Sequence, residues 1–128
     1  AFANGKKIDR ITGLDRLYTS NVTDMSYMFA ETDRYDGAST IHYVPSPSVF
    51  NQPLNNWNVS NVTNMSHMFW RAKAFDQPLD NWNVSNVNSM NAMFTDSVLN
   101  QENYCKTVKG PYSDKWSKAD LGLKYVCK

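Results

Sequence analysis

The sequence predicts an α/β fold in which about three similar coils, each a short parallel strand followed by a short helix, stack as a right-handed solenoid. Three observations predict it: a 25-residue repeat, an apolar pattern that changes from alternation to helical spacing within each copy, and unrepeated sequence at the C-terminal end. The length of 128 residues suits one domain and is too short for two ordinary ones.

The repeat occurs twice almost unchanged, beginning at Phe50 and again at Phe75. Each copy continues into a Met-x-x-Met-Phe box, and a weaker copy begins at Leu14. Leu14 is equivalent to Leu54, 40 residues later rather than 25, which leaves 15 residues for an insertion. We therefore expect a single solenoid domain over 1–128, with these parts: an N-terminal cap at 1–13, repeats at 14–34, 50–74 and 75–99, an insertion loop at 35–49, and a C-terminal cap at 100–128.

The elements of each coil follow from its apolar pattern. Trp57 and Val59 alternate with polar residues, which predicts a strand. A helix is predicted from apolar residues three and four positions apart, namely Val62, Met65, Met68, Phe69 and Ala72. The period of 25 lies within the range of leucine-rich repeats, and the Leu-x-x-Trp-x-Val-x-Asn string starting at Leu54 follows their outline. The predicted solenoid is therefore leucine-rich-repeat-like, and its stacked coils bury the Leu, Trp and Val positions.

The string from Phe50 to Phe69, Phe-Asn-Gln-Pro-Leu-Asn-Asn-Trp-Asn-Val-Ser-Asn-Val-Thr-Asn-Met-Ser-x-Met-Phe, resembles a known repeat. It is similar to the surface-protein repeat of about 25 residues of the BspA-like and mycoplasma-lipoprotein type. The resemblance covers residues 14–30 and 50–101. It implies a leucine-rich-like solenoid on a secreted or surface protein without enzymatic activity. The arrays of this family are typically longer, and the insertion at 35–49 is not part of its repeat.

The methionines and asparagines of the repeat each have two interpretations. Met-x-x-Met pairs bind copper(I) in some proteins, but the following Phe and the repeat register favour a place in the core. Asn21, Asn61 and Asn86 occupy the position at which leucine-rich repeats bury an Asn that bonds the adjacent coil. A second set is expected to point outward, as a binding face for glycan or protein or simply as a solvated surface: Asn56, Asn58, Asn81 and Asn83.

Two cysteines, Cys105 and Cys127, lie 22 residues apart in the predicted C-terminal cap. In a reducing compartment they would be ordinary thiols, but at the end of a short repeat domain they are better interpreted as a disulfide. Such a bond stabilises the fold by about 3 kcal/mol, by restricting the unfolded chain. We therefore expect an extracellular or cell-surface location, or another oxidising compartment such as an organelle lumen.

Composition and motifs argue against catalysis and against nucleic acid. The formal net charge of +1 gives no general attraction to nucleic acid or to acidic membranes, and no apolar run reaches the roughly 18 residues of a membrane helix. Neither His42 nor His67 has a Cys or carboxylate at metal-ligand spacing, and no phosphate-binding loop or nucleophile motif is present. We expect no enzymatic activity, no cofactor, no metal and no transmembrane segment.

We place partner binding on outward and inserted residues. The aromatic groups of the insertion are favoured because aromatic side chains are enriched at interface centres. The full set is Tyr35, His42, Tyr43, Arg16, Tyr18, Asn56, Asn58, Asn81 and Asn83. The leading hypothesis is a non-enzymatic module for protein or glycan recognition, or a structural repeat, in a surface, secreted or lumenal protein, with a protein partner favoured. The alternative is a small accessory or scaffold subunit docked onto a larger complex, such as a membrane complex of an organelle lumen.

Overall fold

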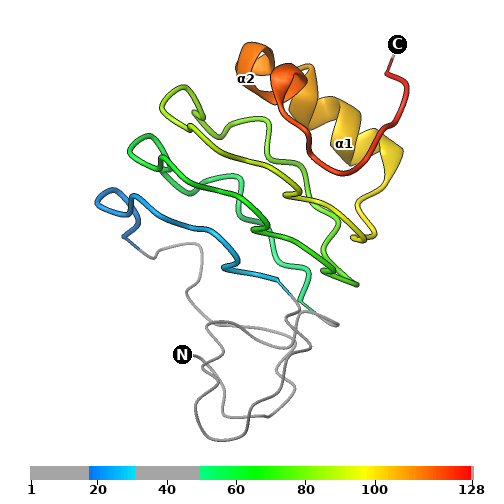
Figure 1. Ribbon diagram of the computed structural model, residues 1–128, viewed down its shortest axis with the longest axis horizontal. Coiled ribbons are helices and arrows are strands. Elements are labelled where there is room, and N and C mark those ends of the chain that lie inside the picture. The colour runs from blue at the N-terminus through cyan, green and yellow to red at the C-terminus, as the bar shows by residue number, and fades with distance from the viewer. Residues whose placement is uncertain (1–17, 31–49, 128) are drawn as a thin grey trace, which may run out of the picture.

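The computed structural model describes residues 18–30 and 50–127. These residues contain two helices, α1 (Gln101–Val108) and α2 (Ser113–Lys118), which contact each other. Three similar turns of chain stack on one another, and the helices lie over the last of them (Figure 1). The predicted N-terminal cap at 1–13 and the insertion at 35–49 lie outside the described residues.

The predicted solenoid of strand-plus-helix coils is wrong. Within the described parts of the three repeats there is neither a helix nor a strand. Two isolated parallel bridges, Asp24 to Asn64 and Asn64 to Ser89, are the only β-type pairings there. The side chains of Trp57 and Val59 are buried and that of Asn58 is exposed, as the alternation predicts, but this segment joins no sheet.

Left-handed residues explain why the Met-x-x-Met-Phe boxes do not form helices. Tyr27, His67 and Ala92 occupy the same position of the three boxes and have φ values of 60°, 58° and 57°. In each box the N–H of the second Met donates to the C=O of the first at 3.2 or 3.3 Å. The left-handed residue is the third of this turn, as in type II turns. A residue in that conformation ends a right-handed helix, so the chain turns instead.

The N–H groups between these turn bonds donate to the next repeat. Met65, His67 and Phe69 donate to carbonyl groups of the third repeat at 2.7, 3.0 and 2.9 Å. Met25 and Tyr27 donate in the same way to the second repeat. Because alternate N–H groups close turns within a repeat, the bonds between repeats stay isolated and no ladder of a β-sheet develops. The N–H groups of Met65, His67 and Phe69 nevertheless all find partners, as is usual for buried backbone.

The apolar repeat positions form one buried core, as the sequence predicts. The Leu, Trp and Val positions of the second and third repeats are at most 4 % exposed: Leu54, Trp57, Val59, Leu79, Trp82 and Val84. The interpretation of the methionines as core residues is confirmed, because five of the six are buried and Met28 packs against the same core. The indole N–H of Trp82 donates to the Leu54 carbonyl at 2.8 Å, which satisfies the one polar atom of that side chain.

A column of aromatic rings runs through this core along the direction of stacking. The rings of Phe29 and Phe69 lie 5.2 Å apart, and those of Phe69 and Phe94 lie 5.6 Å apart. Trp116 of α2 continues the column, 6.4 Å from Phe94. The helix therefore supplies a ring at the place where a further repeat would supply one.

The C-terminal residues close the end of the stack. The N–H of Ala92 donates to the Asp120 carbonyl, and that of Phe94 to the Leu121 carbonyl, both at 2.8 Å. α1 begins after Asn100, whose side chain accepts a bond from the Asn103 N–H at 2.9 Å and so caps the helix. The last repeat is thus covered by chain that is not a repeat.

Candidate functional site

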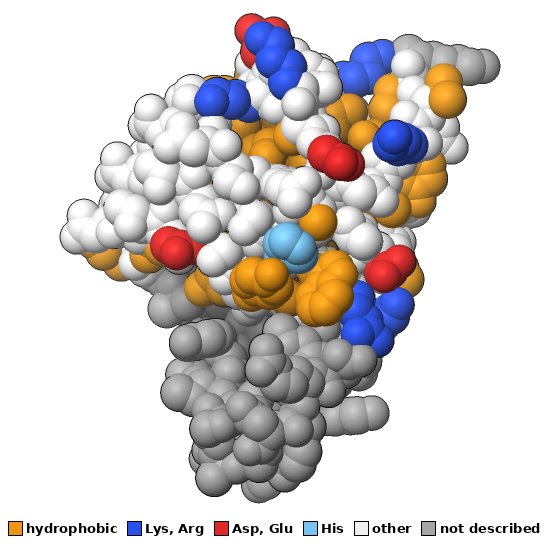
Figure 2. Space-filling model, viewed as in Figure 1, with side chains coloured by type: hydrophobic (Ala, Val, Ile, Leu, Met, Phe, Trp, Pro, Cys, Tyr) orange, Lys and Arg blue, Asp and Glu red, His pale blue; other side chains and the backbone are white. Residues whose placement is uncertain are grey.

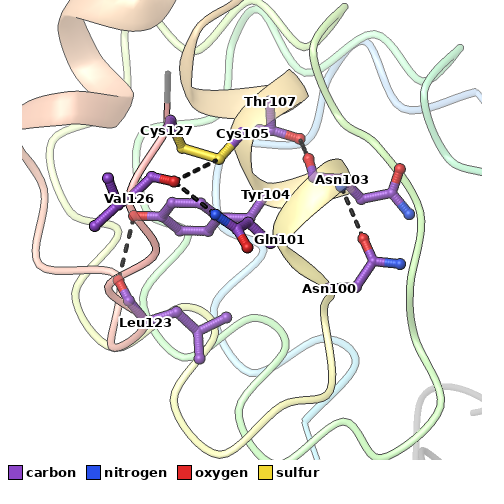
Figure 3. Close-up of a disulfide and its surroundings, with 9 residues drawn as sticks. All are labelled: Asn100, Gln101, Asn103, Tyr104, Cys105, Thr107, Leu123, Val126 and Cys127. Carbon is purple, nitrogen blue, oxygen red and sulfur yellow. Dashed lines mark hydrogen bonds between the residues drawn. A yellow bond between two sulfur atoms is a disulfide. The ribbon is translucent and has the colours of Figure 1, made fainter.

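The predicted disulfide between Cys105 and Cys127 is present, with the two Cα atoms 5.5 Å apart. It ties the C-terminal segment to α1, as Figure 3 shows. Gln101 of the same helix donates to the Val126 carbonyl at 2.6 Å, and the Tyr104 hydroxyl donates to the Leu123 carbonyl at 3.2 Å. Burial raises the pKa of the Tyr104 hydroxyl, so this group stays a hydrogen-bond donor through neutral pH. The disulfide therefore strengthens an attachment that hydrogen bonds also make.

The predicted outward amide face is partly occupied by bonds within the protein. The Asn58 side-chain oxygen accepts from the Ser60 N–H at 3.0 Å, and that of Asn83 accepts from the Ser85 N–H at 3.1 Å. These bonds close turns of the kind that Asn side chains favour. Asn56 and Asn81 are exposed. Asn58, which is exposed, and Asn83, which is half-buried, therefore both have a structural role.

The predicted burial of the first asparagine set is wrong, although the predicted bond is right at two positions. Asn21, Asn61 and Asn86 are all exposed. The side-chain amide of Asn61 donates to the Ser20 carbonyl at 2.7 Å, and that of Asn86 donates to the Ser60 carbonyl at 2.8 Å. Each of these two amides joins its repeat to the preceding one, and it does so from the surface.

Among the other predicted binding residues, Tyr18 is 75 % exposed. Arg16, Tyr35, His42 and Tyr43 lie outside the described residues. The insertion, which the sequence favours as the binding segment, therefore stays a prediction.

The structure assembles an aromatic group that the sequence analysis did not predict, here called the turn-edge cluster: Tyr27, His67, Trp70 and Arg71. The Tyr27 and His67 rings are stacked, with centroids 4.7 Å apart and planes within 7° of parallel. The Trp70 ring meets both edge-on, at 6.3 and 6.0 Å. The Arg71 guanidinium lies 5.5 Å from the centre of the Trp70 ring, close enough for a cation–π contact.

The turn-edge cluster is accessible from one side of the molecule. Tyr27 is 44 % exposed and the other three side chains are half-buried. In Figure 2 the histidine side chain lies between hydrophobic side chains at the surface. His67 Nδ1 is buried and has no hydrogen-bond partner among the described residues. The cluster thus presents aromatic faces together with a guanidinium donor.

Backbone conformation places the cluster. Tyr27 and His67 are the left-handed residues of equivalent turns in adjacent repeats, so their side chains leave the stack at the same place and meet face to face. A left-handed conformation costs a residue with a side chain about 1–2 kcal/mol, a cost that glycine avoids. Strained residues of this kind concentrate at functional sites.

The sequence contains a signal for this cluster, in the residues that differ between equivalent positions of the three repeats. Tyr27 and His67 fill the same position of the box, where the third repeat has Ala92. Trp70 replaces the small residues Ala30 and Thr95 of the other copies. Residues three and four positions apart share a face of a helix, so the predicted helix would also have placed positions 67, 70 and 71 together. The stacking of Tyr27 on His67 depends on the register of the two turns.

A family model described as "Mycoplasma protein of unknown function, DUF285" matches residues 1–107. The chain belongs to this family. The match to DUF285 confirms the mycoplasma-type part of the resemblance drawn from the repeat, and it does not extend to the BspA-like part or to leucine-rich repeats. No curated protein and no solved structure matches the chain.

The DUF285 match includes all three repeats and ends within α1, at the last turn of that helix. It includes Cys105 but not Cys127, so the disulfide joins the matched region to the segment beyond it. The whole turn-edge cluster lies inside the matched region. Neither helix of the described chain has the length and apolar character needed to cross a membrane.

Proposed function

We propose that this chain is a non-enzymatic recognition module of a surface or secreted protein, and that the turn-edge cluster binds a protein partner. The observation that carries the proposal is the stack of Tyr27 on His67 with Trp70 edge-on to both. Tyr, Trp and Arg are the residue types most enriched where interfaces gain most of their binding energy. The cluster contains all three types.

Physical chemistry supports this surface over the asparagine face. An aromatic ring gains free energy on burial in proportion to its apolar area, whereas an amide must first give up hydrogen bonds to water. Two of the outward amides, those of Asn58 and Asn83, already bond the chain itself. The third repeat has Ala92 at the equivalent position with the same left-handed backbone, so the turn itself does not require the large rings of Tyr27 and His67.

An oxidising location is the second part of the proposal, and the disulfide supports it. Bonds of this kind persist in secreted and cell-surface proteins and are rare where thiols are kept reduced. The resemblance of the repeat to the mycoplasma-lipoprotein type of surface-protein repeat supports the same location.

The test is a binding comparison between matched variants. Tyr27→Ser with Trp70→Ser removes the exposed rings, and Tyr18→Ser serves as the control because it removes an even more exposed tyrosine elsewhere. Each purified protein is titrated against arrayed extracellular proteins and against arrayed glycans. We expect the wild-type protein and the control to bind a common protein target, and the double variant to bind it about 30-fold more weakly, as for loss of a central interface residue.

Three outcomes would contradict the proposal. One is equal binding by the double variant and the wild-type protein. The second is binding to glycans alone, which would replace a protein partner by a sugar. The third is chemical conversion of a bound target by the protein, which would show that the protein is an enzyme.

A further inference from the structure

A cleft of about 460 Å³ lies between the third repeat and α2. Residues 87–91 of the repeat form one wall. The opposite wall contains Asp114, Lys115 and Lys118, followed by Ala119 and Asp120. The cleft is separate from the turn-edge cluster, with which it shares no residue.

In the earlier repeats, the segment equivalent to this wall bonds the repeat that follows it. The Thr23 carbonyl accepts from the Thr63 N–H at 2.8 Å, and the Met25 N–H donates to the Asn64 carbonyl at 2.9 Å. One residue of the incoming chain thus donates and the next accepts. Asp24, between the two bonded residues, forms a parallel bridge with Asn64.

The same pair of bonds recurs at the next step of the stack. The Thr63 carbonyl accepts from the Asn88 N–H, and the Met65 N–H donates to the Ser89 carbonyl, both at 2.7 Å. Asn64 and Ser89 form the second parallel bridge. Each repeat therefore offers its successor one acceptor and one donor, two residues apart, in a fixed direction.

The third repeat offers the same two groups to the cleft. By equivalence they are the Asn88 carbonyl and the Met90 N–H, and neither has a hydrogen-bond partner in the part of the chain that the structure describes. The C-terminal segment bonds only the following positions, where Ala92 and Phe94 donate to it. Met90 is 5 % exposed, so packing in the core holds this residue in place at the wall of the cleft.

We propose that this cleft binds a short extended peptide segment of a partner protein, parallel to the third repeat. One peptide residue donates its N–H to the Asn88 carbonyl, and the carbonyl of the next residue accepts from the Met90 N–H. That second residue lies opposite Ser89. The mode is addition of an extended strand to an open backbone edge, in which main-chain bonds supply affinity.

Peptide chemistry fits the cleft because a peptide backbone carries a donor and an acceptor in this order and spacing. The chain itself places Asn64 opposite Asp24 and Ser89 opposite Asn64, so a small polar residue fits opposite Ser89. The two Asp and two Lys residues of the opposite wall balance in charge. Lys115 is engaged, since its ammonium group donates to the Val87 carbonyl at 2.8 Å. An uncharged pair of peptide residues is therefore the preferred occupant.

The test uses a capped heptapeptide with the sequence of residues 60–66 of this chain, Ser-Asn-Val-Thr-Asn-Met-Ser, which contains the segment that occupies the equivalent place on the first repeat. Amide hydrogen exchange of the full, disulfide-bonded chain is followed by NMR with and without the peptide. We expect exchange at Met90 to slow by about fivefold or more at saturation, because its N–H gains a partner. Exchange at Met65 is expected to stay unchanged, because that N–H is already bonded.

A second peptide isolates the bond to Asn88. Methylating the backbone nitrogen of its threonine removes the donor while keeping the side chains, and we expect binding to weaken by about fivefold or more. Ala119→Leu, which fills the cleft from the opposite wall, should have a similar effect. The double variant of the turn-edge cluster should bind the peptide as the wild-type protein does, so failure of the proposed function and failure of this proposal give different results.

Two results would overturn the proposal. One is an unchanged Met90 exchange rate at millimolar peptide. The other is equal binding of the methylated and unmethylated peptides, which would show that the contact does not run through the backbone of the third repeat.

Discussion

Replacing Phe69 by alanine tests the central claim about what holds the stacked repeats together. The Phe69 side chain is fully buried. Its ring lies 4.2 Å from that of Phe75, 5.2 Å from that of Phe29 and 5.6 Å from that of Phe94. From its place in the second repeat it therefore contacts rings of the first and third repeats. No helix or sheet in the described residues of the repeats joins them in addition.

The expected loss of folding stability has two causes, the lost burial of the ring and the cavity that its removal leaves. Truncation of a buried Phe to Ala typically costs about 3–5 kcal/mol, and each aromatic pair contributes about 0.5–1.5 kcal/mol beyond its buried area. We expect Phe69→Ala to fall at the upper end of that range. Because the free energy of unfolding of small domains is about 5–15 kcal/mol, the variant should lose a large part of its stability.

The measurement is chemical denaturation with the disulfide intact, followed by tryptophan fluorescence and circular dichroism. Phe69→Leu keeps most of the apolar volume and should cost only about 1–2 kcal/mol. Tyr27→Ala removes an exposed ring stack and should cost about 1 kcal/mol or less. A loss below about 1 kcal/mol for Phe69→Ala would refute the view that the ring column holds the repeats together.

Three further predictions concern the cap and one surface turn. Gly122→Ala should destabilise the C-terminal cap, because Gly122 has a φ of 86° and an added Cβ would collide with Thr95. Hydrogen exchange should then be faster at the backbone amides of Ala92 and Phe94, which bond the cap, and unchanged exchange rates would count against this. Replacing both cysteines by serine should lower the free energy of unfolding by about 3 kcal/mol, measured by denaturation, and an unchanged midpoint would contradict it. The bond from the Ser26 backbone N–H holds the pKa of Asp24 below its ordinary value of 3.8. The ionised carboxylate therefore stabilises the fold above pH 3.8, and this contribution is lost as the pH falls through the lower folded-state pKa. Asp24→Asn should remove this small pH dependence of stability, and identical acid titrations of the variant and the wild-type protein would argue against it.

Several features were predictable because they depend only on which residues recur. The 25-residue offset predicts that equivalent apolar positions lie together, and Trp57 and Trp82 are indeed both buried in one core. The place of the methionines in that core followed from the same register. The disulfide followed from the two cysteines in the unrepeated C-terminal region.

The local conformation of the box was mispredicted because spacing does not identify the hydrogen-bond partner. Met65, Met68 and Phe69 have helical spacing, and the same spacing also suits successive tight turns that point apolar groups inward. The outcome depended on His67, which adopts the left-handed conformation and whose N–H bonds the Asn91 carbonyl of the next repeat. Such a partner is 24 residues away, so local propensity does not reveal it.

The sequence by itself determined that the chain repeats, which apolar side chains of the repeats are buried, and which two cysteines pair, because repetition, hydrophobicity and cysteine count are properties of the residues alone. The tertiary structure decided the backbone path and the surfaces. Tyr27 meets His67 only because two turns stack in register, and Asn88 and Met90 face a cleft only because the C-terminal segment bonds the positions after them. Both surfaces arise from contacts between segments distant in the chain, whose energies depend on packing.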